Sequence, residues 1–116
     1  MSPRSWRVRA QDILKAIAEI EEFVSDHQTQ ESFLKDIKAV RAVTACLTLI
    51  GEAANHIPHS VKEKYPEIRW EQIRGMRNRI AHEYFSVDDT VIWKTAKERL
   101  PVFKIQLQKI LESSYE

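Results

Sequence analysis

Hydrophobic residues recur along this chain in steps of three and four, the period of helices that bury one face. The stretch 6–25 has one such face, which Leu14 and Phe23 widen. A longer stretch, about 36–56, has two apolar stripes, which predicts a central helix buried on two sides. Small residues dominate its second stripe, so a second protomer could approach closely there. The apolar positions are Trp6, Ala10, Ile13, Ile17, Ile20 and Val24 in the first helix, Val40, Val43, Leu47, Ile50, Ala54 and Ile57 in the first central stripe, and Ala39, Ala42, Cys46, Leu49 and Ala53 in the second.

A short helix is predicted between these two long ones. Residues 26–30 form a polar connector. Thr29 is a suitable N-cap for a helix that carries Phe33 and Leu34, with Ser32 as the alternative cap.

Proline residues and turn residues predict the helix boundaries in the second half of the chain. Pro58 should end the central helix because it cannot donate the next backbone hydrogen bond. One helical turn is expected over 61–65. The third main helix is predicted to begin at Arg69 or Trp70, and the chain to break at about 85–87.

A fourth helix is predicted after this break, with Asp88 or Asp89 as its N-cap. Pro101 lies inside its apolar pattern and should kink the helix near 97–100. Residues 112–116 are expected to fray. The apolar stripe consists of Trp93, Ala96, Leu100, Phe103, Leu107 and Ile110.

These elements predict an all-α fold, an antiparallel four-helix bundle with a short extra helical segment and a kinked last helix. With 116 residues, we expect one domain over 1–116. Only 2 Gly and 4 Pro are present, too few turn formers for a fold of many strands.

Composition and charge narrow the functional classes. No apolar run approaches the roughly 20 residues that span a bilayer, and the first residues lack the apolar stretch of a signal peptide. A single cysteine, Cys46, cannot form an internal disulfide, so a reducing, cytoplasmic location is expected. The net charge of +1 argues against non-specific binding of long duplexes, and any contact with nucleic acid must use a local patch.

Polar groups with catalytic potential interrupt the apolar stripe of the third main helix. On an ideal helix, Arg77 and Tyr84 lie on the inward stripe, within about 40° of each other, whereas Asn78 and His82 share a different face near Arg74. Because Arg77 and His82 are about 140° apart, one straight helix cannot easily bring both to one small ligand. Either the helix distorts near His82 or the site combines residues of two chains. The full stretch is Arg77-Asn78-Arg79-Ile80-Ala81-His82-Glu83-Tyr84.

The chemistry of these side chains suits cleavage of an RNA phosphodiester. His82 can transfer protons near neutral pH, Arg77 can stabilise charge on a phosphate, and Asn78 can orient a hydroxyl. The RNA 2′-hydroxyl then serves as internal nucleophile and no metal is required. The sequence lacks a carboxylate cluster for Mg²⁺, a Gly-rich phosphate loop and a Cys/His array for zinc. The structural alternative is that these residues cap carbonyls or pair with a buried glutamate.

The same residues carry a resemblance to a known family. Arg77, His82 and Tyr84 match the RX4HXY motif of HEPN-domain toxins, and the chain resembles the HepT family from Trp6 to about Leu111. Further segments that match the family are Gly51-Glu52-Ala53-Ala54-Asn55, Tyr65-Pro66-Glu67-Ile68-Arg69-Trp70, Gly75-Met76-Arg77-Asn78, Trp93 and Leu100-Pro101.

The resemblance implies a metal-independent endoribonuclease without a cofactor, the toxin of a type VII-like toxin–antitoxin pair. HEPN nucleases typically form homodimers that bring two motifs into one cleft. Arg77 and His82 would then be catalytic, Asn78 would position the substrate, a tRNA or an mRNA, and the antitoxin would be an MntA-like nucleotidyltransferase. That partner would transfer AMP to Tyr84. Toxin and antitoxin could also assemble into a larger hetero-oligomer. The structural alternative for Tyr84 is a core tyrosine with its hydroxyl at the rim.

Other candidate residues have weaker patterns. Glu52 is interpreted as a buried or half-buried supporting partner for an arginine, with Arg77 as the candidate. Its spacing to His56 and His59 also suits a metal site, but Pro58 separates the histidines. We expect Cys46 and the three tryptophans to be packing residues, with base stacking as an alternative for Trp70. Arg69, Arg74 and Arg79 give the third helix a local positive edge.

Two other functional classes remain open from the sequence. One is a non-catalytic helical module that docks a nucleotidyltransferase. The other is a purely structural helical dimer.

Overall fold

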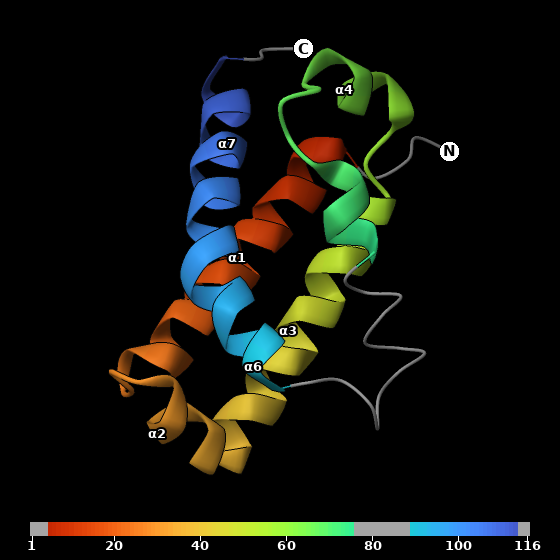
Figure 1. The fold of residues 1–116 in the computed structure, drawn as a ribbon. Helices are drawn as coiled ribbons and strands as arrows, with labels where there is room; N and C mark the ends of the chain where they lie inside the picture. The colour runs from red at the N-terminus through yellow and green to blue at the C-terminus, as the bar shows by residue number, and fades with distance from the viewer. Residues whose placement is uncertain (1–4, 76–88, 114–116) are drawn as a thin grey trace.

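The computed structural model describes residues 5–75 and 89–113, and every described element is a helix or a helical turn (Figure 1). The order confirms the predicted all-α class. The elements are α1 (Trp6–Ser25), α2 (Gln30–Lys35), α3 (Ile37–Asn55), α4 (His59–Lys64), a helix over 70–75, α6 (Asp89–Lys94), the π-helical turn η1 (Thr95–Arg99) and α7 (Leu100–Ser113).

Helix α1 has the bounds that its periodicity predicts. Ser5 caps it, since the Ser5 hydroxyl accepts from the Arg7 amide at 3.1 Å. The predicted stripe is buried except for Trp6, which, like Leu14 and Phe23, packs at the edge of the core. The buried members are Ala10, Ile13, Ile17, Ile20 and Val24.

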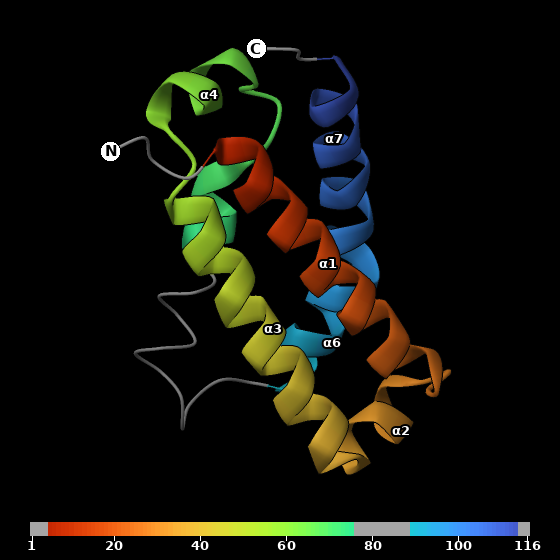
Figure 2. The ribbon, with the colours of Figure 1, turned by 180° about the vertical axis from the view of Figure 1, so that it is seen from behind.

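The connector and the short helix α2 follow the prediction as well. Of the two candidate caps, the structure selects Thr29, whose hydroxyl accepts from the Ser32 amide at 3.1 Å. Phe33 of α2 is fully buried and packs on Trp93, with ring centroids 5.2 Å apart. Helix α2 therefore closes one end of the molecule, opposite α4 (Figures 1 and 2).

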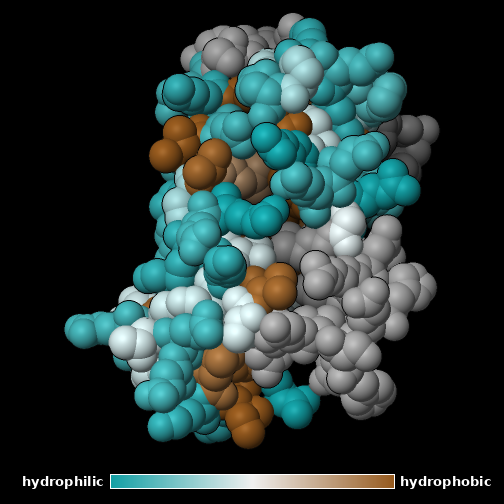
Figure 3. All heavy atoms as spheres, viewed as in Figure 1, coloured by the Kyte–Doolittle hydropathy of each residue, from teal (hydrophilic) through white to brown (hydrophobic). Residues whose placement is uncertain are grey.

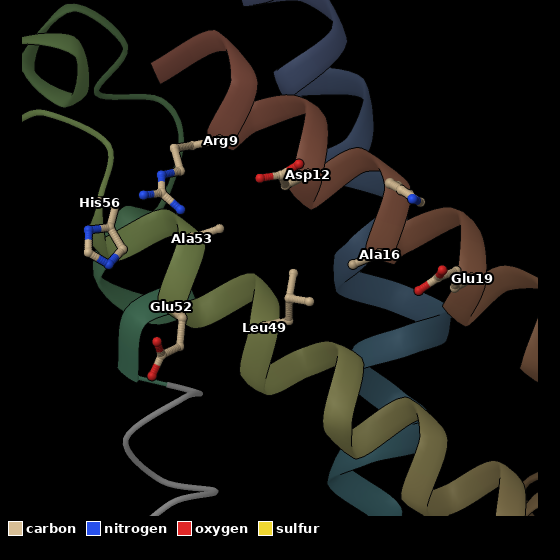
Figure 4. A pocket seen from close by; sticks show the side chains of 9 residues that line it. Arg9, Asp12, Ala16, Glu19, Leu49, Glu52, Ala53 and His56 are labelled. Carbon is tan, nitrogen blue, oxygen red and sulfur yellow. The ribbon is translucent and has the colours of Figure 1, made fainter. Parts of the chain in front are cut away.

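Helix α3 is the central helix, but its two stripes differ in burial. Every residue of the first stripe, from Val40 to Ile57, is buried. In the second stripe Cys46 and Ala53 are buried, whereas Leu49 remains 47% exposed. The prediction of full burial on two sides is thus wrong at Leu49, which lines an open groove between α1 and α3 (Figure 4).

The chain between α3 and the 70–75 helix differs from prediction in detail. Helix α3 ends at Asn55, three residues before Pro58, and Pro58 is instead the N-cap of α4. Trp70 then opens the next helix and is 7% exposed. Its indole Nε1 donates to the Tyr65 carbonyl at 3.2 Å, and its ring lies edge-on to Phe103, with centroids 6.0 Å apart. Trp70 is a packing residue as expected, and its burial leaves no face for base stacking.

The last helix bends where Pro101 predicts a kink. Between α6 and α7 the chain forms one π-helical turn, in which the Leu100 amide donates to the Thr95 carbonyl. Proline lacks an amide hydrogen, so the carbonyl four residues earlier has no ordinary helical partner, and a wider turn accommodates that loss. Asp89 is already the first helical residue of α6, and the alternative cap Asp88 lies outside the described residues.

The helices run antiparallel in sequence order, as the colours of Figure 1 show. Helices α1 and α3 form the main contact, and α7 packs beside α1. The Arg7 guanidinium donates to the Leu111 carbonyl at 3.1 Å and so joins the start of α1 to the end of α7.

Some large hydrophobic side chains remain at the surface. Figure 3 shows such side chains over α7, where Val102 and Ile105 are more than half exposed. Among the described helices, none combines the length and the apolar character needed to cross a membrane.

A polar cluster joins the connector after α1 to α2 and to the start of α3. The His27 ring contacts the Ser32 hydroxyl through Nδ1 at 2.7 Å and the Asp36 carboxylate through Nε2 at 3.0 Å. Asp36 also caps α3, because its second carboxylate oxygen accepts from the Ala39 amide at 3.1 Å. The Ala39 amide first, and the His27 hydrogen bond second, lower the pKa of Asp36 below its usual 3.8.

Because of this lowered pKa, the charged Asp36 side chain stabilises the fold at neutral pH, and this stabilisation is lost as the pH falls. Asp36 binds protons less readily in the folded chain than in the unfolded chain, so its contribution is complete above about pH 5 and disappears as pH falls through the folded pKa. We expect Asp36→Asn to lower the midpoint of thermal unfolding near pH 5.5, and the difference from wild type to shrink towards pH 2.5. Asp26→Asn, at the exposed end of α1, is the control. An Asp36→Asn difference that stays constant over this range would contradict the role of the charged cap.

Candidate functional site

The predicted catalytic residues follow directly after a well-anchored helix. The 70–75 helix begins at Trp70, and the Arg69 carbonyl accepts from the Gln72 amide at 3.1 Å in its first turn. Arg77, Asn78, His82 and Tyr84 lie outside the described residues, so the structure does not test their predicted geometry.

Two contacts from the last helix hold the segment that leads into the motif. The Arg99 guanidinium, in the π-helical turn, donates to the Gln72 side-chain oxygen at 3.2 Å. The Gln106 side chain donates to the Glu67 carbonyl at 3.2 Å. Together with the Trp70–Phe103 contact, they hold the segment 67–72 against the last helix.

Glu52, the predicted supporting residue, is exposed rather than buried or half-buried. It lies on the last turns of α3 and lines a groove of about 410 Å³ between α1 and α3. Figure 4 shows its carboxylate directed away from Arg9 and Asp12 of α1. Glu52 and Leu49 are both exposed because both line this groove instead of packing against α1.

The groove itself is an unsuitable surface for a nucleic-acid backbone. Three acidic side chains face an arginine, a lysine and a histidine around the exposed Leu49, so the groove has no net attraction for a row of phosphates. The charged and titratable lining residues are Arg9, Lys15 and His56 on the basic side and Asp12, Glu19 and Glu52 on the acidic side.

Cys46 is a core residue, as its position in the stripe predicts. Its thiol donates to a carboxylate oxygen of Glu19 at 3.7 Å. Burial, followed by the negative charge of Glu19, raises the pKa of Cys46 to about 11. Because only the thiolate is a good nucleophile, Cys46 is unsuited to covalent catalysis at neutral pH.

The histidines and acids near the end of α3 do not form a metal cluster. His59 is 85% exposed and pairs with Glu63, at 3.6 Å, rather than with Glu52 or His56. Within the described residues, no three His, Cys, Asp or Glu side chains are placed to hold an ion together.

The positive edge predicted for the third helix has a partner that the sequence pattern missed. The Lys62 ammonium of α4 lies 6.0 Å from the centroid of the Trp70 ring, close enough to Arg74 for that charge to affect its pKa. The spacing of Lys62 and Arg74 in the sequence contains no periodic signal for this contact, since a connector separates their helices.

Comparison with known proteins gives one consistent family. The model of the family described as "Ribonuclease HepT-like" matches residues 13–110. A "Putative RNase" of Methanocaldococcus jannaschii is 36% identical over 116 residues, which cover 100% of this chain and 99% of that protein. A "Probable ribonuclease HepT" of Thermococcus cleftensis is 42% identical over 107 residues, or 92% of this chain and 96% of that protein.

A third relative, a "Putative RNase" of Caldanaerobacter subterraneus, is 38% identical over 82 residues, or 71% of this chain and 73% of that protein. No solved structure matches the chain significantly. In this chain, the matched range 13–110 contains the segment 77–84. The chain therefore belongs to the HepT-like family.

Proposed function

We propose that this chain, as one domain over 1–116, is a metal-independent endoribonuclease and the toxin of a type VII-like toxin–antitoxin pair in the cytoplasm. One observation carries the proposal: a family match over 13–110 encloses an intact RX4HXY motif at Arg77, His82 and Tyr84. The names of the relatives, which cover nearly the whole chain, support the same activity.

In the proposed reaction, the RNA 2′-hydroxyl attacks the adjacent phosphorus and the 5′-oxygen leaves. His82 acts as general base or general acid, because imidazole exchanges protons near neutral pH. Arg77 stabilises the charge that builds on the phosphate oxygens, and Asn78 positions the substrate. Since the nucleophile belongs to the substrate, the reaction needs neither a metal-activated water nor a protein nucleophile.

The active site is proposed to combine two chains. Arg77 and His82 point about 140° apart on a straight helix, so each phosphate would meet Arg77 of one chain and His82 of its partner. A homodimer places two such motifs face to face. Glu52, exposed on α3, is proposed as a supporting carboxylate for the motif cation.

Regulation is proposed to act on Tyr84 through an MntA-like nucleotidyltransferase. An adenylate attached to this tyrosine, two residues from His82, adds bulk and negative charge beside the reacting phosphate. Both effects oppose RNA binding. A complex of the toxin dimer with the antitoxin would then be larger than either component.

The catalytic role predicts a selective loss of activity. We expect His82→Ala to reduce cleavage of total RNA in EDTA by at least about a hundredfold, the lower range for losing a general acid or base. His59→Ala is the matched control, because this exposed histidine of α4 lies outside the motif. Circular dichroism should show equal helix content in all three proteins. Equal cleavage by wild type and His82→Ala would contradict the assignment. Absence of cleavage by wild type would favour a binding module.

The two-chain site predicts complementation between inactive variants. Arg77→Ala and His82→Ala should each be inactive, but their mixture should recover activity after unfolding and refolding together. If subunits mix at random, half of the dimers are hybrid and each has one intact site of two, which gives about a quarter of wild-type activity. Recovery should be absent when the variants are assayed together without subunit exchange. No recovery in proven hybrid dimers would place Arg77 and His82 in the same chain.

Modification at Tyr84 predicts a mass change that depends on one hydroxyl. Incubation with ATP, Mg²⁺ and the cognate nucleotidyltransferase should add AMP units to wild type and abolish RNA cleavage. Tyr84→Phe should gain no mass, whereas Tyr65→Phe, which alters a half-buried tyrosine outside the motif, should be modified like wild type. Intact mass spectrometry measures both. AMP addition to Tyr84→Phe would place the modification elsewhere.

A further inference from the structure

A lysine and an arginine lie on the two helices that precede the motif in the sequence. Lys62 lies on α4 and is half-buried, and Arg74 lies on the exposed side of the 70–75 helix. The Lys62 ammonium is 6.0 Å from the centroid of the Trp70 ring. Figures 1 and 2 show α4 and the segment that follows it at the same end of the molecule, opposite α2.

The Trp70 side chain, over which Lys62 lies, is held in place by its own contacts. Trp70 is buried, its Nε1 is bonded to the Tyr65 carbonyl at 3.2 Å, and its ring is held edge-on by Phe103. The same tryptophan begins the helix on which Arg74 lies. Trp70 thus contacts one of the two cationic residues and begins the helix that carries the other.

The two positive charges are close enough to oppose each other. Burial lowers the pKa of Lys62 below its usual 10.5, and the charge of Arg74 lowers it further, while Glu71 acts in the opposite direction. Among the described residues, neither Lys62 nor Arg74 forms an ion pair with a carboxylate. By contrast, Lys104 contacts both carboxylate oxygens of Glu21, at 3.1 and 3.2 Å.

An anion placed between these two groups would remove their repulsion. A phosphate suits both of them, because an arginine offers a fork of donors and a lysine offers a compact positive charge. Arg74 also precedes Arg77 by only three residues, so a phosphate bound here would belong to the same ligand as the phosphate at the motif.

We infer that Lys62 and Arg74 form an auxiliary phosphate site that binds the RNA backbone near the cleaved bond. This inference rests on the proposed ribonuclease function. The two residues act on substrate binding, whereas Arg77 and His82 act on the reacting phosphate. Such a local site also answers how a chain of net charge +1 holds a polyanion.

The test measures binding separately from cleavage. An oligoribonucleotide with 2′-O-methyl groups cannot be cut by its own 2′-hydroxyl, so fluorescence anisotropy reports binding alone. We expect Lys62→Gln and Arg74→Gln each to weaken its binding several-fold at low salt. Each should also reduce the slope of log K against log salt by about 0.7, the value for one phosphate contact on a single strand. Glu71→Gln, which removes the opposing charge, should tighten binding.

Lys104→Gln is the matched control, because it removes one positive charge from the Glu21 pair elsewhere on the bundle. It should leave binding and its salt slope nearly unchanged. On cleavable RNA, Lys62→Gln and Arg74→Gln should raise KM with kcat little changed, which a merely structural defect would not produce. Thermal unfolding checks that all variants fold alike.

The outcomes separate this inference from the proposed function. Weaker RNA binding by Lys62→Gln and Arg74→Gln supports the phosphate site even if wild type cuts no RNA. Normal KM and an unchanged salt slope in both variants overturn the site even if wild type is an active ribonuclease. Unchanged RNA binding combined with loss of AMP transfer would also overturn it, and would assign the cations to the partner protein. Wild type that binds no RNA would overturn it as well.

Discussion

The contact between α1 and α3 is the constraint on which the rest of the structure depends. Ile13 and Ile17 of α1 and Leu47 and Ile50 of α3 belong to one hydrophobic core, and all four side chains are essentially inaccessible to solvent. Burial of each such side chain contributes about 1.5–3 kcal/mol. The contact between α1 and α3 is the largest between any two of the described elements, and α7 packs against α1 while α2 packs against α3. The two helices also leave a groove between them, which is lined by charges of both signs and in which Leu49 is exposed.

The second constraint is covalent and comes from Pro101. A missing amide hydrogen forces the last helix to rearrange one turn earlier, and the chain does so with the π turn over Thr95–Arg99. Buried Thr95 stabilises that turn through its hydroxyl, which donates to the Val91 carbonyl at 2.7 Å. The turn also carries Arg99, which holds Gln72. The π turn in the last helix thus carries a side chain that contacts the 70–75 helix.

Periodicity predicted the long helices well because each repeats one pattern over many turns. The bounds of α1, the Thr29 cap and the bend before Pro101 all follow from local chemistry, and the structure confirms them. Leu49 and Glu52 were misjudged because burial at the margin of a stripe depends on a neighbouring helix, which one helix's pattern does not encode. The Lys62–Trp70–Arg74 cluster was missed for a related reason, since a connector brings its members together. For the motif residues themselves, the sequence and the family match remain the basis, because they lie outside the described residues.

The near-neutral charge of the chain has a functional logic if its substrate is RNA. A uniformly basic surface would bind any nucleic acid tightly, and much of that binding would hold RNA away from the catalytic groups. Binding energy that is uniform over the surface lowers KM without raising the rate of the chemical step. Lys62, which lies over the Trp70 ring, and Arg74, on the helix that Trp70 begins, are instead proposed to act on RNA that already approaches the motif. Because Lys62 and Arg74 repel each other in the free protein, binding of a phosphate between them is more favourable. The two residues therefore increase the affinity for RNA at this place without making the whole surface attractive to nucleic acids.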